Sequence, residues 1–106
     1  MIKKADVYRN YPLVKPIIVN ERKIDEIIIS SHYEENHSAY MKDEIIIELV
    51  KILDGKTFPI EDKKTNPNRE FFMLDNIPYQ NKLYRLVWCL WQENSYLGVI
   101  NCYRRK

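Results

Sequence analysis

The hydrophobic pattern is clearest in residues 83–103. Two runs rich in aromatic and β-branched residues, 83–91 and 96–103, flank the turn-type residues Gln-Glu-Asn-Ser. This arrangement is typical of a β-hairpin. Both tryptophans, Trp88 and Trp91, lie in its first run. We therefore expect this hairpin to form the centre of a sheet.

Alternation along the hairpin assigns its residues to two faces. If Trp91 lies opposite Tyr96, then Arg85 lies opposite Cys102. One face then holds Arg85, Val87, Cys89, Trp91, Tyr96, Ile100, Cys102 and Arg104. The other holds Tyr84, Leu86, Trp88, Leu90, Leu97, Val99, Asn101 and Tyr103. The second face is more uniformly apolar at mid-strand, so it is expected to meet a helix, while the first is partly open. A slip of one residue would exchange these assignments.

Three segments with regular patterns precede the hairpin. Residues 23–32 contain the run Ile-Ile-Ile and end in Ser-Ser-His, which predicts a strand. From residue 38 or 41 to residue 54, apolar residues recur at helical spacing, which predicts the main helix. Ser38 is the expected N-cap and Gly55 the expected C′ residue. Residues 71–74, Phe-Phe-Met-Leu, predict another strand.

The remaining segments are predicted to be irregular. Pro12 and Pro16 exclude a helix from residues 1–20, so we expect an extended arm or a short strand at 17–19. Residues 56–69 combine prolines with charged residues and asparagines, which favours a loop.

The order of these elements predicts an α+β fold. A strand, a helix and a loop are followed by three strands with short links, which pair in antiparallel fashion. We expect an antiparallel sheet of about four strands, a strand–helix–three-strand meander, with one main helix on one face. The 106 residues make a single domain, with an N-terminal arm at 1–20 and a core at 24–105.

Composition excludes several classes of function. No apolar run approaches the roughly 20 residues of a membrane-spanning helix, and the N-terminus lacks the apolar stretch of a signal peptide. We therefore expect a cytoplasmic protein, or one exported by a route that leaves no such signal, with no membrane partner. Cys89 and Cys102 are expected to be small buried hydrophobes, because no CxxC spacing is present and the register does not pair them.

The sequence also lacks the motifs of several enzyme classes. Two glycines cannot build a glycine-rich phosphate loop, and no nucleophile constellation or metal-ligand spacing is visible. This pattern disfavours nucleoside-triphosphate enzymes, zinc enzymes and serine-type hydrolases. We expect no cofactor and no metal. RNA carries its own nucleophile in the 2′-hydroxyl, so a metal-free ribonuclease needs only a base, an acid and cations.

Basic side chains near strand ends are candidates for binding phosphate. The net charge is only +2, but the chain ends in Tyr-Arg-Arg-Lys, and a local basic patch can bind phosphate without an extreme overall charge. Arginine suits this role because its planar fork binds two oxygens and stays charged. The candidates are Arg69, Arg85, Arg104, Arg105 and Lys106.

Histidines and tyrosines supply the other candidate chemistry. An unperturbed imidazole titrates near neutrality, so His32 or His37 can act as an acid or base. His32 is the stronger candidate because it ends a predicted strand at the rim of the sheet. Tyr84 and Tyr103 can stack on an unpaired base. Each residue also has an ordinary structural alternative: a solvated arginine, a loop histidine or a packed strand tyrosine.

The order of elements resembles a known group of proteins. A strand ending Ile-Ile-Ile-Ser-Ser-His-Tyr, a helix, and a meander closing on Tyr-Leu-Gly-Val-Ile-Asn-Cys-Tyr-Arg-Arg resembles the small bacterial toxin nucleases of the barnase, EndoU, colicin-nuclease and RelE-like group, with BrnT-like toxins nearest in pattern. The resemblance covers about residues 24–105. It implies a toxin–antitoxin ribonuclease that cleaves RNA without a metal, either free or on the ribosome, and is neutralised by a cognate antitoxin or immunity protein.

The resemblance also implies roles for individual residues. His32 would be the acid or base, Arg85 and Arg104 would bind phosphate, and Tyr103 would stack on or orient the substrate. Further RNA contacts would come from His37, Arg69, Tyr84, Arg105 and Lys106.

Two features depart from this group and leave alternatives open. The net charge is lower than that of a free ribonuclease, and the N-terminal arm has no obvious counterpart. One alternative is a non-catalytic binding module on the same scaffold, such as an inhibitor or immunity protein, with exposed tyrosines and tryptophans as interface anchors. Another is a phosphate-binding regulatory domain without chemistry.

Overall fold

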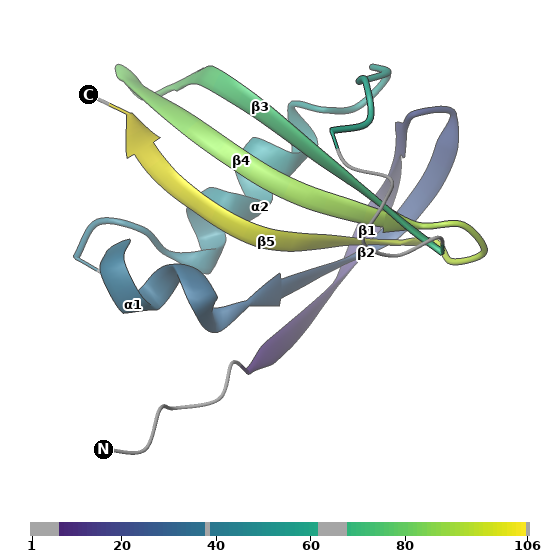
Figure 1. The fold of residues 1–106 in the computed structure, drawn as a ribbon, viewed down its shortest axis with the longest axis horizontal. Coiled ribbons are helices and arrows are strands. Elements are labelled where there is room, and N and C mark those ends of the chain that lie inside the picture. The colour runs from purple at the N-terminus through teal and green to yellow at the C-terminus, as the bar shows by residue number, and fades with distance from the viewer. Residues whose placement is uncertain (1–6, 38, 62–67, 106) are drawn as a thin grey trace.

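A sheet and a helical layer make up the fold (Figure 1). The structure, a computed structural model, describes residues 7–37, 39–61 and 68–105. The strands are β1 (Tyr8–Val19), β2 (Arg22–Ser30), β3 (Arg69–Tyr79), β4 (Lys82–Trp91) and β5 (Tyr96–Arg105). Between β2 and β3 lie the 3-10 helix η1 (Ser31–Tyr33), the short helix α1 (Glu34–His37) and the main helix α2 (Asp43–Lys51).

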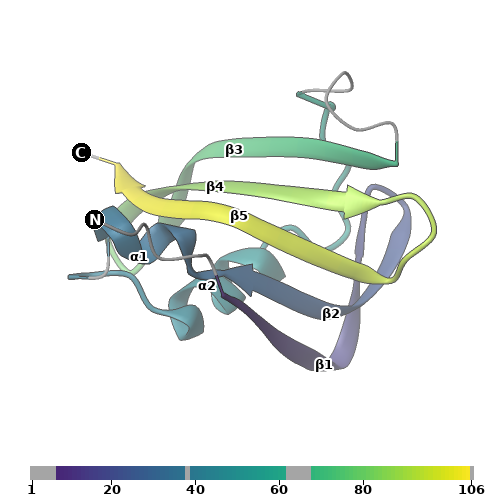
Figure 2. The ribbon, with the colours of Figure 1, turned by 60° about the horizontal axis from the view of Figure 1, so that its bottom comes forward.

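The α+β class and the single main helix are confirmed, but the predicted sheet differs in detail. The sheet has five strands in the order β1-β2-β5-β4-β3. Strands β2 and β5 are parallel, and all other neighbours are antiparallel. Figure 2 shows β5 between β2 and β4, with β1 and β3 at the edges. The sheet is mixed because the helical segment carries the chain back across the sheet, so that β5 runs alongside β2 in the same direction.

The predicted N-terminal arm is largely a strand. β1 pairs with β2 through a tight turn at Asn20 and Glu21, whose φ angles of 54° and 63° are typical of a hairpin turn. Pro12 and Pro16 are compatible with β1 because it is an edge strand, where a missing N–H need not cost a ladder bond. The pairing also shifts register between Pro12 and Ile17. Residues 1–6 of the arm lie outside the described residues.

The main helix is shorter than predicted. It begins at Asp43, with Lys42 as N-cap and no side-chain hydrogen bond at that cap, and it ends at Lys51 rather than at residue 54. Ser38, the expected N-cap, lies outside the described residues. Gly55 does adopt a positive φ of 81°, and its N–H donates to the carbonyl of Ile18 at 2.7 Å. None of the described helices has the length and apolarity to cross a membrane.

The core fills the space between α2 and one face of the sheet. Trp88 is fully buried, stacks on Phe72 with ring centroids 5.5 Å apart, and meets the edge of Phe58 at 5.1 Å. The apolar face of α2 contributes Ile46, Leu49 and Val50, which are all buried. The hairpin face predicted to meet a helix is buried on β4 from Tyr84 to Leu90.

A bulge in β5 reverses the predicted faces near the C-terminus. Cys89 lies opposite Gly98, as the predicted register requires, but the pairing shifts between Val87 and Trp88. Ile100 is the residue left without a partner in this ladder. Beyond this point every residue of β5 faces the opposite side from the one predicted.

Because of this bulge, the strand pairing and the faces predicted from the sequence are wrong for the last residues of β5. Arg85 lies opposite Tyr103, not opposite Cys102. Cys102 is fully buried on the helix side, whereas Tyr103 joins Arg85 on the open face of the sheet. Arg104 turns to the helix side, where its guanidinium lies 4.5 Å from the ring centroid of Tyr40.

The carboxylate of Asp43 is the centre of a buried polar cluster that joins β1, η1 and α2. Arg9 donates to it from Nε at 2.6 Å and from Nη2 at 2.8 Å. Tyr11 donates to Oδ2 at 2.5 Å, and Tyr33 donates to Oδ1 at 2.7 Å. The Arg9 guanidinium also pairs with Glu34 at 2.7 Å. Asp43 itself is 8% exposed.

These contacts determine the protonation state of Asp43. Burial alone would raise the pKa of its carboxyl, but hydrogen bonds from Arg9, Tyr11 and Tyr33 outweigh burial and lower the pKa to about 2. A carboxyl with a depressed pKa stabilises the fold above its unfolded pKa of about 3.9. This stabilisation is lost as the pH falls through the folded pKa, and it amounts to about 2 kcal/mol at neutral pH.

The first prediction concerns this carboxylate. Asp43→Asn should lower the free energy of unfolding at pH 7 by about 2 kcal/mol and flatten its decline between about pH 5 and pH 2. Urea unfolding across this pH range measures both effects. Glu48→Gln is the control, because Glu48 pairs with Lys51 on the exposed side of α2 and should matter little. An Asp43→Asn protein with wild-type stability and pH dependence would contradict the assignment.

The second prediction concerns the two thiols. Cys89 and Cys102 are free and buried, which confirms their expected role, and burial raises the pKa of Cys89 to about 11 and of Cys102 to about 12. Since the thiolate is the reactive form, neither should react with a thiol reagent in the native protein at pH 8. Both should react on unfolding in denaturant. Rapid labelling of either thiol without denaturant would contradict this prediction, because it would show that the packing around that thiol opens in the native protein.

Candidate active site

Functional side chains gather on the face of the sheet opposite α2, here called the open face. In Figure 1, α2 lies behind β3, β4 and β5, and the open face is turned toward the viewer. The helix α1 lies beside β5, at the border of this face. Arg85, Val87, Cys89 and Trp91 all point to the open face, because they alternate along β4 with buried residues.

A connected group of polar side chains occupies the end of the open face near the C-terminus. The ring of His37 stacks on Tyr103, with centroids 4.9 Å apart and planes at 19°. Its Nδ1 lies 2.8 Å from the hydroxyl of Tyr40. Arg85 donates from Nη1 to the hydroxyl of Tyr103 at 3.0 Å. The network therefore joins α1 and the segment that follows it to β4 and β5.

Asp75 extends this group to a second guanidinium. Arg85 donates from Nη2 to Asp75 Oδ2 at 2.8 Å, and Arg105 Nε lies 3.1 Å from Oδ1. Asp75 reaches this position because it follows Met73, which pairs with Val87, by two residues along β3 and so lies on the same face as Arg85. We call these six residues the C-terminal network: His37, Tyr40, Asp75, Arg85, Tyr103 and Arg105.

The C-terminal network is charged and accessible. The hydrogen bond from Arg85 lowers the pKa of Asp75, and the same bond raises the pKa of Arg85, so both groups are ionised at neutral pH. The side chains of Asp75, Arg85 and Arg105 are 29%, 25% and 39% exposed. His37 and Tyr103 are half-buried. A ligand can therefore reach an imidazole, a phenol and two guanidinium groups in one place.

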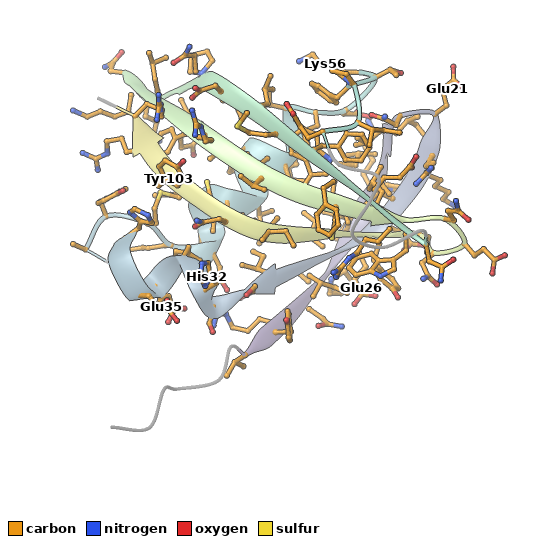
Figure 3. All side chains as sticks on the ribbon, in the orientation of Figure 1. Glu21, Glu26, His32, Glu35, Lys56 and Tyr103 are labelled. Carbon is orange, nitrogen blue, oxygen red and sulfur yellow. The ribbon has the colours of Figure 1, made fainter. Side chains whose placement is uncertain are left out.

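A second feature, the open-face hollow, lies at the other end of this face. It has a volume of about 580 Å³ and is lined by residues of all five strands and by His32. Arg69 and Trp91 form part of one wall. His32 Nδ1 lies 3.7 Å from Glu35, and Figure 3 shows the two side chains beside η1 and α1.

The structure brings four of the sequence-predicted site residues together and separates the others. His37, Arg85, Tyr103 and Arg105 belong to the C-terminal network. His32 and Arg69 line the open-face hollow instead. The imidazole that contacts Tyr103, the partner of Arg85, is therefore His37, which the sequence analysis gave as the weaker acid–base candidate and as an RNA contact.

Two predicted residues lie outside both features. Arg104 lies on the helix side of β5 because of the bulge, although it stacks on Tyr40, which contacts His37. Tyr84 is 4% exposed and packs against Tyr79 in the core, where its ring is covered rather than open to a base. Lys106 lies outside the described residues.

Several residues of the two features were missed from the sequence. Asp75 and Tyr40 were not singled out. The role of Asp75 depends on the register of β3 against β4, and that of Tyr40 on the return of the helical segment to β5. Trp91 was assigned to the more open face, and with the same alternation its neighbourhood could have been recognised as a binding surface. Tyr8 was missed because β1 was predicted to be mostly an arm.

Neither a metal-binding cluster in the described part of the chain nor a known relative points to a function for the C-terminal network or the open-face hollow. Among the described residues, no group of three or more His, Cys, Asp or Glu side chains is arranged to hold a metal ion. Comparison of the chain with protein-family models, with curated proteins and with solved structures finds no match. The geometry of the C-terminal network is therefore the basis for inferring a function.

The third prediction concerns the charge balance of this network. Asp75→Asn removes the carboxylate that pairs with Arg85 and Arg105, so both guanidinium groups should bind an external anion more strongly. The variant should elute from heparin at higher salt than the wild type. Asp25→Asn, which changes the net charge equally at the hairpin end of β2, is the control. Equal elution of the two variants would show that Asp75 does not restrain a phosphate-binding pair.

Proposed function

We propose that this protein is a metal-independent ribonuclease and that the C-terminal network is its active site. The observation that carries the proposal is the stack of His37 on Tyr103, whose hydroxyl accepts a hydrogen bond from Arg85. An imidazole, a phenol hydroxyl and a cation are thus joined in one chain of contacts, with Tyr103 in the middle. Cleavage of RNA needs these groups, because the substrate supplies its own nucleophile.

His37 is suited to act as the base. Its Nδ1 is occupied by the Tyr40 hydroxyl, so Nε2 is the ring nitrogen left for substrate. When Nδ1–H donates to Tyr40, Nε2 can accept the proton of a ribose 2′-hydroxyl. The freed 2′-oxygen then attacks the adjacent phosphorus, and the bond from phosphorus to the 5′-oxygen breaks. The products are a 2′,3′-cyclic phosphate and a 5′-hydroxyl.

Arg85 and Tyr103 are suited to the other half of the reaction. The raised pKa of Arg85 keeps it charged, so it stabilises the additional negative charge of the phosphorane-like transition state. The leaving 5′-oxygen needs a proton, which the Tyr103 hydroxyl can donate. A guanidinium bonded to the phenol oxygen stabilises the phenolate that remains. Arg105, tied to Asp75, is placed to bind a neighbouring phosphate.

The proposal extends to the biological class. A small ribonuclease of the toxin–antitoxin kind, acting in the cytoplasm on free or ribosome-bound RNA, would require a protein antitoxin or immunity partner. The open face offers aromatic and arginine side chains, which commonly anchor protein interfaces. A partner that covers this face would block the C-terminal network.

One observation favours a second candidate function. Asp75 pairs with both Arg85 and Arg105, so the carboxylate already neutralises much of the charge that would bind phosphate. This arrangement suits a non-catalytic protein-binding module, such as an inhibitor or immunity protein, whose open face docks on a target. RNA cleavage by the purified protein distinguishes the two candidates.

The fourth prediction tests the acid–base assignment. His37→Asn should slow cleavage of a fluorogenic single-stranded RNA by about 100-fold or more, the usual contribution of a proton-transfer group. Tyr103→Phe, which keeps the ring stack, should also slow the reaction. Thermal unfolding of each variant checks that the fold is retained. Lys51→Gln, on the exposed side of α2, should cleave at the wild-type rate.

Substrate controls complete this test. RNA with a single 2′-deoxy position at the cleavage site should resist the enzyme, because the internal nucleophile is gone. If the wild type leaves RNA intact under all conditions, the binding module is the better account. Cleavage by His37→Asn at the wild-type rate would instead place the active site elsewhere.

A further inference from the structure

The open-face hollow has a built shape that the C-terminal network does not explain. At about 580 Å³ it falls within the usual size range of small-ligand sites, roughly 300–1,000 Å³. One side of it is aromatic and cationic, and the other is polar. Such a division suits a planar, partly polar group.

The absence of a side chain at Gly98 creates the floor of this hollow. A Cβ at Gly98 would lie 2.8 Å from Cη2 of Trp91, 3.0 Å from its Cζ3 and 3.1 Å from Sγ of Cys89. Real Cβ atoms essentially never show the first of these distances, and the other two are tighter than nine in ten real Cβ contacts. The indole of Trp91 therefore lies against the sheet only because Gly98 leaves room for it.

The aromatic wall is held in place by its neighbours. Tyr96 meets Trp91 edge-on, with ring centroids 4.8 Å apart. The guanidinium of Arg69 lies 5.6 Å from the ring of Trp91 and 4.8 Å from that of Phe71. An arginine beside a half-buried tryptophan combines a stacking surface with a cation.

The polar wall comes from β1, β2 and the start of η1. Asn10 donates through Nδ2 to Glu26 at 2.7 Å, which orients its amide. The hydroxyl of Ser30 accepts from the N–H of His32 at 3.2 Å. Amide, hydroxyl and imidazole groups can pair with the edge of a base, while Tyr8, 67% exposed, adds another ring at the rim.

We propose that the open-face hollow binds one unpaired base of an RNA strand, with the base stacked against Trp91 and the adjoining phosphate beside Arg69. Aromatic stacking of unpaired bases with nearby arginine is the usual chemistry of single-strand binding. This inference rests on the proposed ribonuclease function, since it identifies a part of the substrate. A protein side chain in the same hollow is the competing occupant.

The position of the hollow predicts how substrate length matters. Trp91 and Arg85 lie six residues apart on the same face of β4, which corresponds to about 20 Å. The base in the hollow is therefore not the one beside the cleaved bond. A substrate must be several nucleotides long before it can occupy both sites.

The test separates binding from cleavage. In a His37→Asn background, which should bind RNA without cleaving it, the affinity for a labelled ten-nucleotide single-stranded RNA is measured by fluorescence anisotropy. Adding Trp91→Ala should weaken binding about tenfold or more, the usual effect of losing one stacked base. Adding Gly98→Ala, which retains every aromatic and charged group, should also weaken binding, because the new Cβ displaces the indole of Trp91.

Two further variants test whether a loss of affinity comes from the hollow or from a loss of the fold. Tyr8→Ala changes an exposed rim residue that carries no core packing, and it should weaken binding by a smaller factor. Met73→Ala, on the open face but outside the lining of the hollow, is the control and should bind as the parent does. Circular dichroism confirms that each variant is folded.

Each outcome decides the inference without depending on cleavage. If folded Trp91→Ala and Gly98→Ala bind the RNA as tightly as the control, the hollow is not a base site, even if the protein is a ribonuclease. If both lose affinity while the wild type never cleaves RNA, the base site stands and the proposed catalysis fails. In an active wild type, Trp91→Ala should slow cleavage of a ten-nucleotide RNA but not of a dinucleotide.

Discussion

The buried carboxylate of Asp43 is the constraint on which the arrangement of the helical layer depends. It accepts hydrogen bonds from Arg9 and Tyr11 on β1 and from Tyr33 at the end of η1. A buried charge is tolerated only when it is paired and hydrogen-bonded, and here both oxygens are satisfied from separate parts of the chain. The edge strand, the 3-10 helix and the first turn of α2 are thereby fixed to one point.

This constraint reaches the candidate active site through the chain itself. α1 lies between Tyr33 and Asp43 in the sequence, and both of its flanking segments are held by the same carboxylate. His37, at the end of α1, is thereby presented to Tyr103 on β5. The site thus forms where two layers meet. Asp43 fixes the position of the helical segment, and the strands β3, β4 and β5 supply the sheet face.

Local pattern was sufficient for the meander but not for the arrangement of the site. Alternation along β4 correctly predicted the residues on its helix side, because a strand with one face on the core must alternate, although Cys89 on the open face is buried as well. β1 was largely missed, since its prolines suit an edge strand as well as an irregular arm. The bulge at Ile100 could not be predicted, because one unpaired residue in β5 has no distinct sequence signal. It moved Tyr103 onto the open face and Arg104 off it. The choice of His37 over His32 depended on long-range packing, which no local window contains.

The central claim is that the imidazole of His37 accepts the proton of a ribose 2′-hydroxyl of RNA. A direct measurement is simple because the chain has two histidines, His32 and His37. The ring protons of both can be followed by nuclear magnetic resonance while a 2′-O-methyl single-stranded RNA, which cannot be cleaved, is added to the wild-type protein. The account predicts a saturable shift of the His37 resonances that disappears in Arg85→Gln. RNA that binds and leaves the His37 resonances unmoved would contradict it.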